Sequence, residues 1–96
     1  MTRNLEGRML RALCLSAARS DVTIALRASA ERPWSSATFS GGRWTMTLEV
    51  AGANGAAWLA ILPEEDLPVP GHLVADLIVA TTGDGMATVE MLLLEA

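Results

Sequence analysis

The sequence predicts a single α+β domain, residues 1–96, whose antiparallel sheet of about five strands carries both helices on one face. Three observations support this fold class. An amphipathic helical pattern opens the chain, segments with the alternation of strands follow it, and two apolar runs flank a Gly-Asp-Gly turn near the C-terminus. A chain of 96 residues is long enough for one core of moderate size.

Residues 4–19 predict an N-terminal amphipathic helix. Its apolar residues recur every four positions, as expected for one helix face: Leu5, Met9, Leu13 and Ala17, with Leu10 beside them. Three arginines point the other way: Arg8, Arg11 and Arg19. We expect this helix to pack on its own sheet. Binding to a membrane surface or a partner, and a targeting role, are the alternatives, but Arg11 interrupts the apolar region that a signal peptide needs.

After this helix the sequence predicts a three-stranded antiparallel meander. Residues 22–28 alternate as a half-buried strand, 34–40 form a strand rich in Ser and Thr, and 43–50 form the clearest strand. The segment Glu31-Arg32-Pro33 is expected to separate the first two strands. A tight turn at Gly41-Gly42 is expected between the last two.

Residues 55–62 admit two interpretations. The alanines of GAAWLAIL favour a short second helix, capped by Asn54 and ended before Pro63. Alternatively, Asn54-Gly55 forms a hairpin turn and residues 58–62 add a fourth strand to the meander. We favour the helix because Ala is a weak strand former.

The segment between this helix and the C-terminal strands is short. Residues 63–66 predict one acidic helical turn that begins with proline. Residues 67–71, LPVPG, predict a stiff extended connector.

Residues 72–95 predict a β-hairpin with one of two registers. A two-residue turn at Asp84-Gly85 places Asp76 among apolar side chains, whereas a three-residue loop at 83–85 places Asp76 and Glu90 on the opposite face. We expect the three-residue loop. One face of the hairpin is then free of charge: Leu73, Ala75, Leu77, Val79, Val89, Met91 and Leu93.

The second face of this hairpin predicts an interface. It carries four aliphatic residues around the two acids: Val74, Ile78, Leu92 and Leu94. Burial of each would stabilise the protein by about 1.5–3 kcal/mol, so we expect either a helix of the same chain or a second copy to cover them. Hydrophobic residues make up 51% of the chain and the mean hydropathy is +0.34, which favours self-association. The sequence therefore predicts a homodimer, with a different protein partner as a further expectation.

The charges are unevenly distributed along the chain. All seven basic residues are arginines between Arg3 and Arg43, and eight acids with no Lys or Arg follow from Trp44 onward. We expect the two halves to face each other within a chain or across a dimer; an anionic partner for the basic half is the alternative. The acidic pI near 4.8 argues against nucleic-acid binding.

Two further features bear on the compartment. No apolar run approaches the roughly 20 residues that a membrane span needs, so we expect no membrane-spanning segment. Cys14 is the single cysteine and has no disulfide partner within the chain, which favours a reducing, cytoplasmic compartment.

We expect no enzymatic activity, no cofactor and no metal. His72 is the lone histidine, and its candidate acidic partners are Glu64, Glu65, Asp66 and Asp76. Three of these acids are adjacent in sequence, and adjacent side chains seldom converge on one ion. Cys14 lies within the first helix far from His72, so it is interpreted as a packing residue.

A small-ligand-binding protein is the alternative to the interaction module. Three tryptophans in so short a chain suit an apolar pocket, and an arginine beside them suits a planar or anionic ligand. The residues expected to line such a pocket are Trp34, Arg43, Trp44 and Trp58.

Overall fold

The computed structural model describes residues 2–95, with side chains from residue 5 onward. Seven elements follow one another along the chain: α1 (Thr2–Ala18), β1 (Thr23–Ser35), β2 (Ser40–Ala51), α2 (Gly55–Ile61), the 3-10 turn η1 (Leu62–Glu64), β3 (His72–Gly83) and β4 (Met86–Glu95). The fold is α+β with one antiparallel sheet, as predicted, but the sheet has four strands rather than about five.

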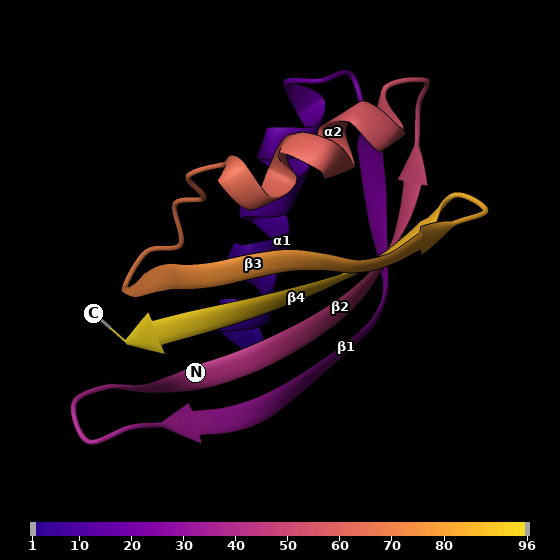
Figure 1. Ribbon diagram of the computed structural model, residues 1–96. Helices are drawn as coiled ribbons and strands as arrows, with labels where there is room; N and C mark the ends of the chain where they lie inside the picture. Colours follow the sequence, from indigo (N-terminus) through magenta and orange to yellow (C-terminus); the bar gives the residue numbers. More distant parts are fainter. Residues whose placement is uncertain (1, 96) are drawn as a thin grey trace.

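The strand order is β1-β2-β4-β3, so β2 and β4 form the centre of the sheet. Each half of the chain is a helix followed by an antiparallel hairpin, and the two halves join where β2 pairs with β4. Since α2 carries the chain across from β2 to β3, these two strands run parallel with β4 between them. Figure 1 shows α1 behind the sheet and crossing the strands, with α2 at the top.

The meander prediction was wrong in its strand boundaries. One continuous strand, β1, runs through Pro33, and the chain turns at 36–39 rather than at Gly41-Gly42. Proline is tolerated because β1 lies at the edge of the sheet. The Ser36 hydroxyl instead stabilises the turn by accepting hydrogen bonds from the amides of Thr38 and Phe39, at 3.4 and 3.1 Å.

The two glycines lie inside β2, where β4 leaves no room for a side chain at Gly41 and the Glu31 side chain of β1 lies close to Gly42. A Cβ added at Gly41 would lie 1.8 Å from the carbonyl oxygen of Leu93, and one at Gly42 would meet the Glu31 side chain. Glycine within this strand therefore marks a close approach of neighbouring groups. The Gly-Gly pair suggested a turn in the sequence, but the chain turns at residues 36–39 instead.

The predicted apolar stripe of α1 is confirmed. It is buried against one face of the sheet, which we call the inner face: Leu5, Met9, Leu13 and Ala17. The alternation predicted for residues 43–50 is present in β2, and one side of it belongs to the same core: Trp44, Met46 and Leu48. Trp58 of α2 and Leu62 of η1 belong to the same core, so both helical segments contribute to it. Each such buried side chain stabilises the fold by about 1.5–3 kcal/mol.

The helical interpretation of residues 55–62 is confirmed, but the predicted side-chain cap is not. Asn54 precedes α2 without a side-chain hydrogen bond to the helix, and its Nδ2 instead donates to the carbonyl oxygen of Ser20 at 3.0 Å. This bond links the start of α2 to the end of α1. The acidic turn after it is the 3-10 turn η1, which ends at Glu64.

The C-terminal hairpin combines features of both predicted registers. The turn has two residues, Asp84 and Gly85, with φ of 53° and 74° as a type I′ turn requires. A bulge at Ala80 then shifts the pairing by one, so Val79 lies opposite Val89. The three-residue loop was therefore wrong, but the pairing that it predicted at the centre of the hairpin is present.

A second bulge at Ala75 shifts the pairing of β3 again. It places Val74 opposite Leu93 on the inner face, packed against the core, and turns Leu73 outward. The predicted faces of Leu73 and Val74 are therefore exchanged. Sequence reasoning missed this because regular alternation was assumed along all of β3.

Candidate functional site

The face of the sheet opposite the helices, which we call the outer face, is uncovered. Cross-strand pairing arranges its side chains in rows that run β1, β2, β4, β3. Three neighbouring rows are Ala30, Thr45, Glu90 and Ile78; Arg32, Arg43, Leu92 and Asp76; and Trp34, Gly41, Leu94 and Leu73. The outer face therefore carries a basic side over β1 and β2, and a mixed apolar and acidic side over β4 and β3.

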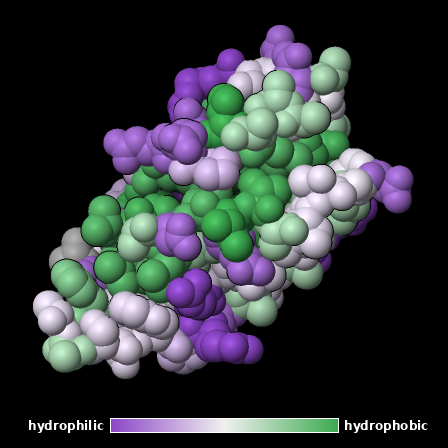
Figure 2. Space-filling view, viewed as in Figure 1, coloured by the Kyte–Doolittle hydropathy of each residue, from purple (hydrophilic) through white to green (hydrophobic). Residues whose placement is uncertain are grey.

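The apolar side of the outer face includes the most exposed large side chain of β3. Leu73 is 58% exposed and Ile78 is 45% exposed, while Leu92 is half-buried and Leu94 is 8% exposed. Figure 2 shows hydrophobic side chains gathered over β3 and β4, with hydrophilic ones over the β1 and β2 side. We call Leu73, Ile78, Leu92 and Leu94 the hydrophobic patch. Three of its four members are predicted interface residues, and Leu73 takes the place of Val74.

The basic side of the outer face has two arginines directly opposite each other. Arg32 of β1 pairs with Arg43 of β2, and neither guanidinium has a hydrogen bond or ion pair within residues 2–95. Like charges in directly opposed positions are unfavourable. Asp76 and Glu90 on the other side of the face also have no ion pair with any described residue. The outer face thus holds two arginines and two acids that form no ion pair with any residue whose side chain the structure describes.

The structure does not bring together the four residues of the predicted ligand pocket. Trp44 lies in the core under the inner face, whereas Arg43 and Trp34 project from the outer face. Trp58 is buried beneath α2. Two neighbours in sequence on a strand point to opposite faces, which separates Arg43 from Trp44.

A polar network that is buried at Trp58 and Ser16 and reaches the surface at Arg19 joins the two helices. The Trp58 indole Nε1 donates to the Ser16 hydroxyl at 2.9 Å, and that hydroxyl donates to the Glu65 carboxylate at 2.8 Å. Arg19 donates to the same carboxylate oxygen at 3.1 Å. Hydrogen bonds from Ser16 and then Arg19 lower the pKa of Glu65 below its usual value, although desolvation opposes them. The network satisfies an indole in the core and holds residue 65 against α1.

His72 and Cys14 are the remaining polar candidates. His72 is half-buried at the start of β3, its Nδ1 has no partner in the described part of the chain, and it lies opposite Glu95. Cys14 is a half-buried free thiol on α1. Residues 2–95 contain no group of three or more His, Cys, Asp or Glu side chains placed to hold a metal ion. No helix within that range is long and apolar enough to cross a membrane.

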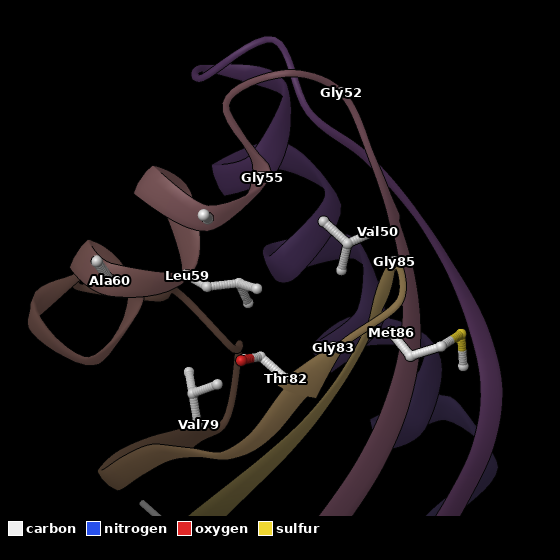
Figure 3. Close-up of a pocket in the computed structure, with 11 residues that line it drawn as sticks. Val50, Gly52, Gly55, Leu59, Ala60, Val79, Thr82, Gly83, Gly85 and Met86 are labelled. Carbon is white, nitrogen blue, oxygen red and sulfur yellow. The ribbon is translucent and has the colours of Figure 1, made fainter.

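A cavity of about 550 Å³ lies between α2 and the distal ends of β2 and β3. Sequence reasoning missed it. Three residues with larger apolar side chains surround it, Val50, Leu59 and Val79, and Met86 borders it at the start of β4 with its side chain directed away in Figure 3. In Figure 3, Val50 and Leu59 point toward each other across the space, and the Thr82 hydroxyl lies near Val79. The signal for this cavity in the sequence is the glycine and alanine content of residues 51–60, which leaves little side-chain volume to fill the space.

Comparison with known proteins gives no relative from which a role can be transferred. No protein-family model, curated protein sequence or solved structure matches this chain.

Proposed function

We propose that the protein is a non-enzymatic interaction module that forms a homodimer through the outer face of its sheet. The observation that carries this proposal is the exposed hydrophobic patch, in which Leu73 and Ile78 are 58% and 45% exposed on a face that neither helix covers. An exposed apolar surface bordered by polar residues is typical of an interaction site.

The outer face is large enough to form an interface. Four strands spaced about 4.8 Å, with about nine paired residues rising about 3.3 Å each, outline a face of roughly 19 by 30 Å. A standard interface buries about 800 Å² on each partner. This face, with the side chains that project from it, supplies most of such an area.

The charges of the outer face favour a second copy as its partner. A two-fold axis parallel to the strands, between β2 and β4, lays the β1 side of one copy over the β3 side of the other. Each Arg32 then faces Asp76 of the second copy, and each Arg43 faces the apolar Leu92 with Glu90 in the neighbouring row. The same face therefore supplies both the charges and their counter-charges.

The two sheet edges are less suited to self-association than the face. Pro33 removes an amide donor from β1, and β3 carries two bulges, at Ala75 and Ala80. Prolines and bulges at edges hinder pairing with another strand. These features favour packing between faces over extension of the sheet from edge to edge.

The experiment compares the oligomeric state of the wild type with that of Ile78→Lys/Leu92→Lys, by light scattering coupled to size-exclusion chromatography. We expect a wild-type dimer and a folded monomeric variant, because two lysines on the hydrophobic patch would have to be desolvated in the interface. Circular dichroism establishes that the variant retains its helices and sheet.

A control replaces two exposed hydrophobic residues outside the outer face. Leu15 of α1 is 52% exposed and Ile61 of α2 is 48% exposed, so Leu15→Lys/Ile61→Lys adds the same charge elsewhere. This variant is expected to remain dimeric. A wild-type protein that is monomeric at high micromolar concentration would contradict the proposal.

A further inference from the structure

We propose that the cavity beneath α2 is a binding site for a small, uncharged and largely apolar molecule. The site is separate from the outer face. Val50 and Val79, which line it, point to the inner face, and α2 forms its other wall.

The size of the cavity suits a small molecule. Its volume of about 550 Å³ falls within the range of about 300–1,000 Å³ that is usual for ligand pockets. The space opens to solvent past exposed small residues, among them Ala60, Thr82 and Gly83, so a ligand can enter it without a rearrangement of the fold.

The lining determines the chemical class of the ligand. Val50, Leu59 and Val79 are half-buried and already pack against the core, so the apolar surface of the core continues into the cavity. Among residues 5–95, no charged side chain lines the cavity. A charged ligand would lose its hydration without gaining an opposite charge, which makes an uncharged ligand the better fit.

A few polar groups provide orientation. The hydroxyl of Thr82 belongs to the lining, and Figure 3 shows it on the side of the cavity near Val79. Gly52 and Gly83 contribute backbone without side chains. One hydroxyl and exposed backbone in a mainly apolar lining match the usual composition of a small-molecule site, in which a few polar groups orient the ligand.

The proposal is tested with a neutral apolar fluorophore, N-phenylnaphthylamine, added to the wild-type protein and to Ala60→Phe. Ala60 lines the cavity from α2 and is exposed to it, so a phenyl ring there occupies space that the fluorophore needs. We expect saturable binding of one fluorophore per chain to the wild type. Because the filled cavity no longer accommodates the fluorophore, its affinity should fall at least about tenfold in the variant.

Two controls separate this site from other hydrophobic surfaces. Ala57 is an exposed residue of α2 outside the cavity lining, so Ala57→Phe adds the same ring without filling the space and should bind normally. The Ile78→Lys/Leu92→Lys variant should also bind normally, because its changes lie on the outer face. The proposal of a ligand site in the cavity is therefore tested independently of the proposed dimer.

Amide chemical shifts in two-dimensional NMR locate the bound fluorophore. We expect the largest changes at Thr82, Gly83 and Gly85, which line the cavity. Absence of saturable binding, equal binding by wild type and Ala60→Phe, or shifts confined to the outer face would each overturn the proposal.

Discussion

The buried hydroxyl of Ser16 links the two helices by hydrogen bonds. It is 1% exposed, yet it both accepts from the Trp58 indole and donates to Glu65. A buried polar group without a hydrogen-bond partner lowers the stability of the fold. The Ser16 hydroxyl provides the acceptor for the buried indole N–H of Trp58. The position follows from helix periodicity, because Ser16 lies beside Leu13 and Ala17 on the buried side of α1.

The Glu65 carboxylate makes the stability of the fold depend on pH. Its pKa is lowered in the folded state by Ser16 and Arg19, so folding favours the ionised form. The stabilisation is therefore present above the usual glutamate pKa and is lost as the pH falls through the lowered pKa of the folded state. We expect Glu65→Gln to lower the urea midpoint at pH about 7, and to lose less stability than the wild type on acidification to pH about 3.

The neighbouring Glu64 provides the control for this prediction. It is exposed and forms no side-chain hydrogen bond within residues 2–95, so Glu64→Gln should leave the acid dependence close to that of the wild type. Equal acid dependence in Glu65→Gln and the wild type would show that the network does not stabilise the fold.

At the scale of elements, the local sequence pattern was sufficient to predict the buried side chains of a segment that packs on one face only. The stripe of α1 and the alternation of β2 were both predicted correctly because helix and strand periodicity directly determine which side chains face the core. The bulges at Arg27, Ala75 and Ala80 were missed, since each depends on how the partner strand is aligned. The interpretation of Pro33 and of Gly41-Gly42 as chain breaks was wrong for the same reason. Pro33 is tolerated at the sheet edge, and the two glycines are placed by their neighbours on β4 and β1.

The close approach of β4 to Gly41 predicts a severe effect of a single methyl group. A Cβ there would lie 1.8 Å from a backbone oxygen of β4, which no side-chain rotation relieves. We expect Gly41→Ala to lower the free energy of unfolding by at least about 3 kcal/mol, the upper end of the usual cost of overpacking. Urea denaturation followed by tryptophan fluorescence measures the change.

The same substitution in α1 should have the opposite sign. Gly7 is exposed, and a Cβ there meets nothing within 4 Å. Gly7→Ala should therefore stabilise the protein by about 0.5–1 kcal/mol, the usual advantage of Ala over Gly within a helix. If Gly41→Ala proved as stable as Gly7→Ala, the pairing of β2 with β4 would have to be redrawn.

At the scale of the whole molecule, the two helix–hairpin units produce faces of different character. Alternation in the sequence predicted most of the side chains that leave the core, although not Leu73. It did not predict the strand order β1-β2-β4-β3 or the cavity beside α2. Both arise from contacts between distant segments, which no local pattern encodes. The strand order places Arg32 and Asp76 on opposite edges of one face, about 14 Å or three strand spacings apart.

That separation allows the two-fold arrangement to be tested by charge reversal. Within one chain Arg32 and Asp76 are too far apart to form an ion pair, but the proposed axis places each opposite the other residue in the second copy. Arg32→Glu and Asp76→Arg each bring like charges together twice per dimer, so we expect each to weaken dimerisation about tenfold. The combined variant recreates the opposite charges in reversed positions and should recover most of the wild-type affinity.

Sedimentation equilibrium of the four proteins at low and high salt measures this coupling. The single variants should gain affinity with salt as repulsion is screened, while the wild type and the combined variant should lose some. Additive losses in the combined variant would rule out this axis while leaving a dimer formed in another orientation. Rescue requires the two residues to meet across the interface, because the sheet holds them apart within a chain. Rescue would therefore establish which face of the sheet associates and how the two copies are aligned.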